Sequence, residues 1–302
     1  MSSIHHYWHS GLHIASELAL PEWDAFACGP ANADVRIVLS DLPCPDCPSD
    51  GSVAGGDVMR FAVDGIGGWQ VERGRVITLH PGLTAGPAEL RLFTLGSAWG
   101  AIGYQRGFAM WHGSAVERAG RTVLFCGDQG AGKSTMAAML CKDGARLIAD
   151  DLSRIESSKS PGGLGGPVIH PSSSRIKLWR EAVEHIGWQD RILQRDYLRE
   201  DKFHCAAPNL FGEESVFQLT DIVVLSEGEL TRLSRLTGHE ALSEVMRATL
   251  YRSEMVDALG AWATQGAHIA RVLARSRAWK LTRPKNYTDT LPRLLLERNV
   301  FA

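Results

Sequence analysis

The segment Gly127–Ser134, GDQGAGKS, has the residue types and spacing that hold the phosphates of a nucleotide. It satisfies G-x-x-x-x-G-K-[ST] in full, and it follows the apolar run TVLFC and precedes a run of helical character. Backbone N–H groups of such a loop surround the phosphates at a helix amino terminus. Lys133 would neutralise β- and γ-phosphate oxygens, and the Ser134 hydroxyl would bind Mg²⁺. The predicted nucleotide-binding residues are Gly127, Asp128, Gln129, Gly130, Ala131, Gly132, Lys133, Ser134 and Thr135.

Two adjacent carboxylates, Asp150 and Asp151, end the apolar run LIA further along the chain. In parallel-sheet folds, reactive residues gather where strands end beside the phosphate loop. One carboxylate can bind Mg²⁺ while the other takes the proton from an attacking hydroxyl, and neighbours on a strand face opposite ways. The alternative is a helix cap and a solvated charge. As a working assignment Asp151 joins Ser134 as a metal ligand, although the residues do not distinguish the two carboxylates.

Three further polar residues could take part in the chemistry. His112 lies on a strand expected to pair, by hairpin, with the strand entering the loop, and spacing alone would make it a core or edge histidine. Arg175 and Lys177 stand two residues apart on an expected strand, so both could point at a substrate phosphate or a peptide carboxylate. A solvated pair is the alternative for these two.

The elements that must position these residues fall into two regions. Residues 1–95 read as short alternating runs separated by Gly, Pro and Asp, which predicts a β-rich amino-terminal domain. Residues 96–302 form the predicted catalytic domain, which the helical spacing at 88–107 connects to the first. Its expected elements are a strand pair turning at Ala119–Gly120, a helix ending near Gly144, strands at 146–149, 175–179, 220–229 and 278–284, and helices within 241–276 and 291–298.

The amino-acid composition limits the classes of partner that the protein is expected to bind. The 302 residues are 44% hydrophobic and 22% charged with a formal net charge of -2, which provides no general basic surface for nucleic acid. The start MSSIHHYWHSGLH lacks the pattern of a signal peptide, and no run of 18 apolar residues occurs. We therefore expect a cytoplasmic protein with neither nucleic-acid nor membrane partners. Six scattered cysteines suit a reducing compartment.

Two segments near the amino terminus have the residue types of metal sites. Cys44 and Cys47 have the two-residue spacing of zinc and redox sites, but no second such pair follows and LPCPDCPSDG reads as an irregular loop. Their role is left open. Four histidines also cluster there, although their alternation with apolar residues favours an exposed first strand; they are His5, His6, His9 and His13.

The combination of His112-Gly113, the loop at 127–134 and RLIADD at 146–151 resembles the catalytic domain of the HPr kinase/phosphorylase family. The resemblance is closer to HPr kinase-like proteins of ribosomal peptide clusters, including lasso-peptide tailoring kinases. Shared features include the stretch GLHIASELALPE, the long helix before His-Gly, RIKLW at 175–179 and the terminal LTRP. It implies an α/β P-loop domain with a mixed sheet, and ATP-dependent phosphorylation of a serine on a peptide or small protein, with a lasso-peptide precursor's C-terminal serine as one acceptor.

Carried over residue by residue, the resemblance makes one of Asp150 and Asp151 a catalytic base held near His112, with Lys133 at the phosphates. Lys202 stands where relatives carry Lys-Arg near the phosphates, but Phe203 replaces the arginine. Two departures from the family pattern make plain kinase activity more expected than phosphorylase activity; they are Gln129 inside the loop and Thr135 directly after it. HPr kinases form hexamers, so homo-oligomerisation is left open. The amino-terminal domain and the Gly-rich loop at 157–167 are expected to select the acceptor.

Three alternative functions stay open at this point. An HPr-type protein serine kinase/phosphorylase is the first. A nucleotide-hydrolysing regulator without a phosphate acceptor is the second, and Gln129 could then orient water. The third is a non-catalytic peptide-binding module that keeps its nucleotide for stability, which the intact Lys133, Ser134, Asp150 and Asp151 argue against.

Overall fold

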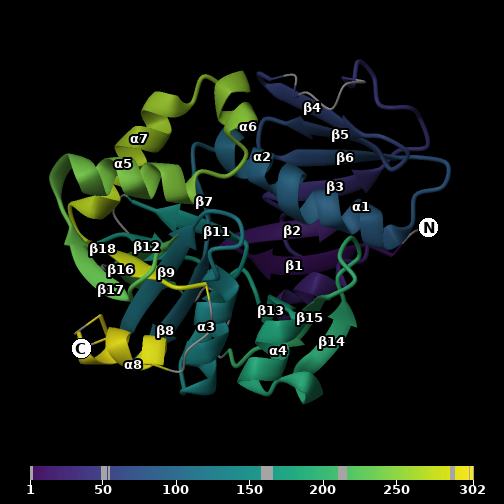
Figure 1. The fold of residues 1–302 in the computed structure, drawn as a ribbon. Helices are drawn as coiled ribbons and strands as arrows, with labels where there is room; N and C mark the ends of the chain where they lie inside the picture. The colour runs from purple at the N-terminus through teal and green to yellow at the C-terminus, as the bar shows by residue number, and fades with distance from the viewer. Residues whose placement is uncertain are drawn as a thin grey trace. The chain divides into compact units, whose positions relative to one another are not determined.

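The computed structural model describes residues 3–48, 53, 55–157, 166–209, 216–285, 290–298 and 300–301 (Figure 1). By its internal contacts the chain divides into two compact units, one of Met1–Met110 with Tyr251–Gln265 and one of Trp111–Leu250 with Gly266–Ala302. The domains expected at 1–95 and 96–302 stay a prediction. Among the described residues, none of the helices combines the length and the hydrophobicity of a membrane span.

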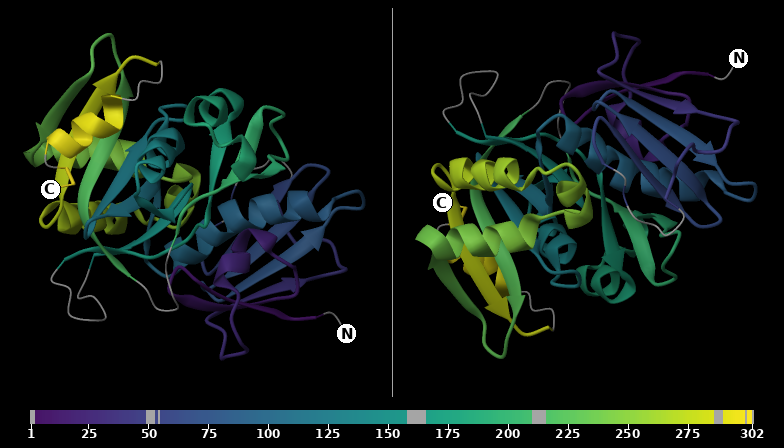
Figure 2. Two further views of the ribbon diagram at one scale, coloured as in Figure 1. Left: turned by 90° about the horizontal axis from the view of Figure 1, so that it is seen from below. Right: turned by 90° about the horizontal axis from the view of Figure 1, so that it is seen from above.

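A six-stranded sheet forms the first unit, in the order β1-β2-β3-β6-β5-β4. The predicted alternating runs become its strands because their apolar residues share one face, where Trp69 and Ile77 are completely buried. The helical segment α1–η2–α2 lies along one face of this sheet (Figures 1 and 2), and Trp69 Nε1 donates to Thr94 Oγ1 at 3.0 Å. The strands are β1 (His5–His9), β2 (Leu12–Ser16), β3 (Val35–Leu39), β4 (Val58–Val63), β5 (Gly67–Glu72) and β6 (Val76–Pro81). The helical segments are η1 (Pro21–Phe26), α1 (Pro87–Phe93), η2 (Thr94–Ala98), α2 (Trp99–Gln105) and α6 (Ser253–Ala258).

The expectation of an exposed first strand is wrong for part of the histidine-rich segment. The chain turns at Ser10-Gly11 into a β1–β2 hairpin, with φ of 53° and 69° at the turn. His9 is 2% exposed and stacks on Trp23 with ring centroids 3.9 Å apart. This histidine therefore lies on the buried face of the strand and not on an exposed one. Cys44 and Cys47 form a disulfide, which departs from the expectation of reduced cysteines, whereas the other four are thiols. No group of three or more His, Cys, Asp or Glu residues suited to a metal occurs in the described ranges.

The second unit contains a nine-stranded mixed sheet, as the sequence predicts for an α/β fold. Its order is β10-β8-β9-β16-β12-β11-β7, with β18 beside β16 and β17 beside β18. The nine strands are β7 (Ala109–His112), β8 (Ser114–Arg118), β9 (Arg121–Gly127), β10 (Arg146–Ala149), β11 (Leu152–Glu156), β12 (Val168–Ile169), β16 (Phe217–Glu227), β17 (Arg232–Leu236) and β18 (Arg277–Arg283). The central strands β9 and β16 read as continuous apolar runs because helices cover the parallel part of the sheet.

Helix α3 (Lys133–Lys142) packs on β8 and β9 and also against a separate three-stranded sheet of order β13-β15-β14. Buried residues of both sides meet there, among them Phe125, Met136, Leu140 and Ile176. The remaining elements are β13 (Arg175–Trp179), α4 (Arg180–Ile186), η3 (Gln189–Arg191), β14 (Ile192–Arg195), β15 (Lys202–Ala206), α5 (Gly238–Thr249), α7 (Trp262–Leu273) and α8 (Thr290–Glu297). The small sheet is thereby fixed beside the phosphate-loop helix.

Strand direction brings four strand ends to one edge of the large sheet. β16 runs parallel to β9 and to β18, with Leu225 opposite Gly127 and Glu227 opposite Arg283. β10 is antiparallel to β8, which is antiparallel to β9, so β10 ends at the same edge as β9. The expected hairpin of the His112 strand with β9 is wrong: β8 pairs with β9, and β7 lies beside β11. His112 thereby ends next to the β10–β11 connection.

Candidate functional site

The phosphate loop spans the end of β9 and the start of α3, as its motif predicts. Gly127, Gly130 and Gly132 have φ of 141°, 85° and 89°, a region that side chains with a Cβ rarely adopt. Lys133 Nζ donates to the carbonyl oxygens of Gly127 at 2.8 Å and Asp128 at 3.0 Å. Burial lowers the pKa of Lys133, and nearby carboxylates oppose that shift. A buried ammonium at a helix amino terminus is suited to neutralising phosphate.

Two arginines from distant sequence contact this loop, and the sequence reasoning missed both. Arg283, at the end of β18, is 6% exposed and donates through Nη2 to the Ala131 carbonyl at 2.9 Å. A Cβ at Gly132 would lie 2.2 Å from that same nitrogen, and the φ of 89° at this position is one that residues with a side chain rarely adopt. Arg247 on α5 pairs with Asp128, Nη1 to Oδ1 at 2.6 Å. For Arg283 the available clue was its place at the end of the last strand of the predicted sheet.

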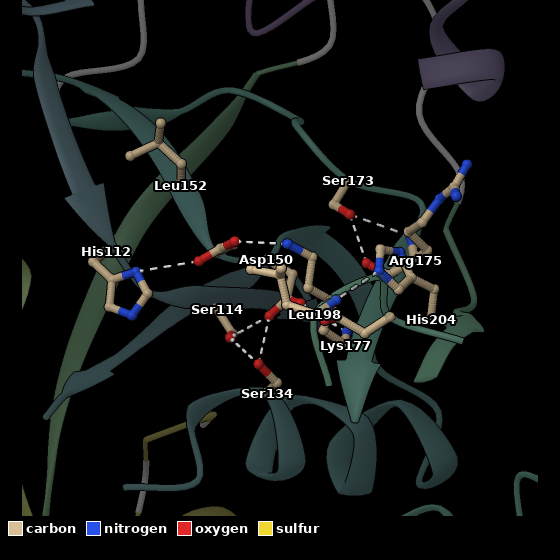
Figure 3. A network of polar contacts seen from close by, with 12 residues as sticks. His112, Ser114, Ser134, Asp150, Leu152, Ser173, Arg175, Lys177, Leu198 and His204 are labelled. Atoms are coloured by element: carbon tan, nitrogen blue, oxygen red, sulfur yellow. Dashed lines mark hydrogen bonds and ion pairs between the residues drawn. The ribbon is translucent and has the colours of Figure 1, made fainter. Parts of the chain in front are cut away.

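The Asp150 carboxylate faces the phosphate loop. Its Oδ1 accepts hydrogen bonds from Ser114 Oγ at 2.6 Å and Ser134 Oγ at 2.8 Å, and its Oδ2 accepts one from the Lys177 N–H at 3.0 Å. Burial raises the pKa of Asp150, and these three hydrogen bonds oppose the rise. Ser114, 1% exposed at the start of β8, is a site residue that sequence reasoning missed. Asp150, and not Asp151 as in the working assignment, thus lies beside Ser134 (Figure 3).

The Asp151 carboxylate faces a different set of groups. Lys177 Nζ is 2.9 Å from its Oδ2, and His112 Nδ1 is 3.4 Å from its Oδ1. Lys177 above all, then His112 and Lys202, hold the pKa of Asp151 well below its usual range against the opposing effect of burial. Asp151 in turn raises the pKa of Lys177. Asp151 is therefore ionised at neutral pH, and Lys177 and His112 fix the orientation of its carboxylate.

A backbone turn separates the two carboxylates. Asp151 has φ of 75°, in the left-handed region, and the Leu152 N–H donates to the Asp150 carbonyl at 3.1 Å. The turn ends β10 and starts β11, and it sends consecutive side chains to Ser134 on one side and to Lys177 on the other (Figure 3). Strain of about 1–3 kcal/mol at such a residue persists where the surroundings hold it in place.

His112 completes this side of the site. It ends β7, and the following Gly113 N–H donates to the Asp151 carbonyl at 3.2 Å, which ties the His-Gly pair to the aspartate turn. Burial lowers the pKa of His112, while Asp151 opposes that effect. Since the ordinary pKa is already below 7, His112 is neutral at pH 7 and can donate or accept one hydrogen bond at each ring nitrogen according to its tautomer.

The remaining predicted contact residues differ in whether their side chains lie near the two aspartates. Lys177 contacts both aspartates, whereas the Arg175 side chain points away from Asp150 (Figure 3). Lys202 begins β15 directly opposite Trp179 and lies close enough to Asp151 to lower its pKa. Of the predicted pair on β13, the structure therefore brings only Lys177 to the carboxylates.

The residues present fit a magnesium nucleotide. The loop offers backbone N–H groups, a buried ammonium and glycines where a Cβ would clash with Arg283 or with the Leu225 carbonyl. The Ser134 hydroxyl and the Asp150 carboxylate supply adjoining oxygen atoms, the donor type that Mg²⁺ prefers. This set lies at the carboxyl edge of the sheet, where α/β proteins bind ligands.

Comparison with known proteins gives little beyond this geometry. No protein-family model matches the chain, and no curated protein matches it. Among solved structures, it is similar to the Hpr(Ser) kinase/phosphatase from Coxiella burnetii at 14% sequence identity and a TM-score of 0.30, covering 64% of this chain and 90% of that one. A likeness of that degree says nothing about activity. The class that the fold and motif define is a P-loop α/β protein.

Proposed function

We propose that the protein is an ATP-dependent kinase that transfers the γ-phosphate to a serine hydroxyl of a peptide or small protein. The observation that carries this proposal is the separation of the two aspartates: Asp150 bonds Ser134 of the phosphate loop, and Asp151 is held by Lys177 and His112. Phosphoryl transfer to a hydroxyl needs one carboxylate for metal and one for the acceptor. Both carboxylates lie at the edge of the large sheet where the phosphate loop begins.

Each residue has a defined task in this reaction. The loop N–H groups and Lys133 bind the phosphates, and Ser134 with Asp150 would hold the Mg²⁺ that neutralises phosphate charge. Asp151 accepts the hydroxyl proton as the serine oxygen bonds to the γ-phosphorus and the bond from that phosphorus to ADP breaks. Because the pKa of Asp151 is low, the carboxylate acts mainly by orienting the hydroxyl, with proton transfer late. Positioning and charge neutralisation supply most of the acceleration.

The acceptor that the sequence resemblance favours is a ribosomal precursor peptide, with its C-terminal serine as the phosphorylated residue. A disordered tail can place a serine at the γ-phosphate in an extended conformation. We also propose that the first unit takes part in acceptor selection and that the reaction occurs in the cytoplasm. The Gly-rich loop expected to share in selection lies outside the described residues at 158–165.

The test is incubation with ATP, Mg²⁺ and synthetic precursor peptides, followed by mass spectrometry. The expected result is a gain of one phosphate that maps to serine and is absent in a peptide whose serine is alanine. Release of ADP at the same rate with and without every peptide would instead support the hydrolysing regulator. Removal of phosphate from a phosphopeptide in the presence of inorganic phosphate would add the phosphorylase activity.

A further inference from the structure

The hairpin of β14 and β15 places a second cation near the carboxylate that faces the acceptor. In the β13–β15 register, Lys177 is opposite His204 and Trp179 is opposite Lys202. Directly opposite residues of antiparallel strands share a face, so Lys177 and Lys202 are diagonal neighbours, about 7–8 Å apart at the backbone. Long side chains on such positions reach the same space.

The connection after β14 fixes Arg199 beside Lys202. Asp196 N donates to the Lys202 carbonyl at 2.7 Å, and Lys202 N donates to the Arg199 carbonyl at 3.2 Å. Asp196, 5% exposed, also accepts from the N–H groups of Leu198 at 3.1 Å and Arg199 at 3.2 Å. A loop with this many internal bonds presents its side chains from a defined position.

Two cations of this hairpin have no carboxylate in direct contact among the described residues. Lys177 is paired with Asp151, and Asp150 already accepts three hydrogen bonds. In the part of the chain that the structure describes, neither Lys202 nor Arg199 forms an ion pair; the Lys202 ammonium lies over the Trp179 ring, 5.5 Å from its centroid. Burial lowers the pKa of Lys202 and the cations Arg199 and Lys177 lower it further, while the carboxylates Asp150 and Asp151 oppose the shift. Two clustered cations that form no direct ion pair with a carboxylate of the described residues favour an anionic ligand.

Resting on the proposed kinase reaction, we propose that Lys202 and Arg199 form a subsite for a carboxylate of the acceptor peptide, carried by the phosphorylated serine itself or by its neighbour. Consecutive Cα atoms are about 3.8 Å apart, so such a carboxylate can reach the second cation while the hydroxyl lies at Asp151. Trp179 and Leu198, 44% and 57% exposed, offer apolar surface to adjoining residues of the peptide. The subsite selects where along a peptide a serine is phosphorylated.

The experiment compares kcat/KM for four peptides of one sequence: serine with a free C-terminus, the same peptide amidated, an amidated peptide with Asp after the serine, and its Asn counterpart. The carboxylate peptides should exceed their neutral partners by about tenfold or more, the scale of a charge-assisted hydrogen bond. Lys202→Met and Arg199→Gln should remove most of that ratio through KM. Arg195→Gln is the matched control, because Arg195 lies opposite Phe203 on the other face of the hairpin.

Equal rates for acid and amide in the wild-type protein would overturn the subsite. An equal loss on both peptides in Lys202→Met would also overturn it and would assign that lysine to the nucleotide phosphates. Which of the first and third peptides is preferred distinguishes a terminal from a side-chain carboxylate. Fluorescence anisotropy of the labelled peptides with a non-hydrolysable ATP analogue decides the subsite independently: tighter binding of the acid, lost in Lys202→Met, would support it even if no phosphate were transferred and the kinase proposal failed.

Discussion

The hydroxyl of Ser134 lies 2.8 Å from Asp150 Oδ1 and donates a hydrogen bond to it, which makes Asp150 the carboxylate of the phosphate loop. The neighbouring Asp151 bonds Lys177 and not Ser134. The proposed kinase reaction therefore assigns two consecutive and chemically identical residues to different tasks, Asp150 to the metal and Asp151 to the acceptor hydroxyl. Substitutions at the two positions should have different effects.

Asp150→Asn should weaken nucleotide binding only where Mg²⁺ is present. The amide keeps one oxygen for the hydroxyls of Ser114 and Ser134 but loses the charge that attracts the metal. We expect ATP affinity in Mg²⁺ to fall to the level that the wild-type protein shows in EDTA, measured by calorimetry in both buffers. A Mg²⁺ enhancement of wild-type size in Asp150→Asn would contradict the metal assignment.

Asp151→Asn should lower turnover and leave nucleotide affinity within about threefold. Losing a positioned proton acceptor costs typically 10²–10⁴-fold, so we expect a fall in kcat of about a hundredfold or more. Single-turnover phosphate transfer alongside ATP calorimetry separates the two effects. Full transfer by this variant would remove Asp151 from the chemistry.

Lys177→Met should raise the pKa of Asp151, because Lys177 is the main cause of its low value. The folded-state pKa of Asp151 lies below its unfolded value of about 3.9. The ion pair therefore stabilises the fold fully at pH values above about 3.9, and this stabilisation is lost as the pH falls through the folded-state pKa. In the variant the acid limb of the kcat/KM profile should move to higher pH, whereas Lys177→Arg should keep the wild-type limb. Profiles that coincide for Met and Arg would show that the ion pair does not control Asp151.

Asp221→Ala should destabilise the second unit through the centre of its sheet. Asp221 on β16 is completely buried and accepts hydrogen bonds from Arg121 at 2.7 Å, from Arg277 at 2.7 Å and from Trp279 at 2.8 Å. Removing it takes the carboxylate away from Arg121 and Arg277, which keep a hydrogen bond to the Val300 carbonyl and are partly exposed, so the cost is at most about 3–5 kcal/mol, that of a broken buried ion pair. Urea unfolding measures the loss, with the exposed Asp190→Asn as control. A loss within 1 kcal/mol would show that water takes over the role of the carboxylate.

Sequence reasoning recovered the parts of the site that are contiguous in the chain. The phosphate loop, its strand and its helix are fixed within one stretch, since glycines with positive φ and a lysine must stand at set spacings. The strands followed for the same reason: alternation of apolar residues needs only neighbours along the chain. Both features are local, so they are readable without a fold.

The contacts that assemble the site come from far apart in the sequence. Ser114 reaches Asp150 because β8 begins where β9 ends, and Arg283 reaches the loop because β18 is parallel to β16. No local sequence pattern indicates which of these strands lie side by side. The different directions of the Asp150 and Asp151 side chains depend on one φ angle, that of Asp151, which strand alternation does not predict. The strand pairing of His112 was mispredicted because sequence proximity was taken for hydrogen bonding.

At residue 151 the left-handed backbone conformation favours glycine, whereas the proposed chemistry requires a carboxylate. Glycine would adopt that conformation without strain, but it would abolish the carboxylate and with it the ion pair to Lys177. Stabilising substitutions at strained functional residues commonly cost activity. A library selected only for heat resistance should therefore tolerate asparagine at residue 151, which accepts a left-handed backbone and keeps an oxygen for Lys177, and a library selected for phosphate transfer should retain aspartate.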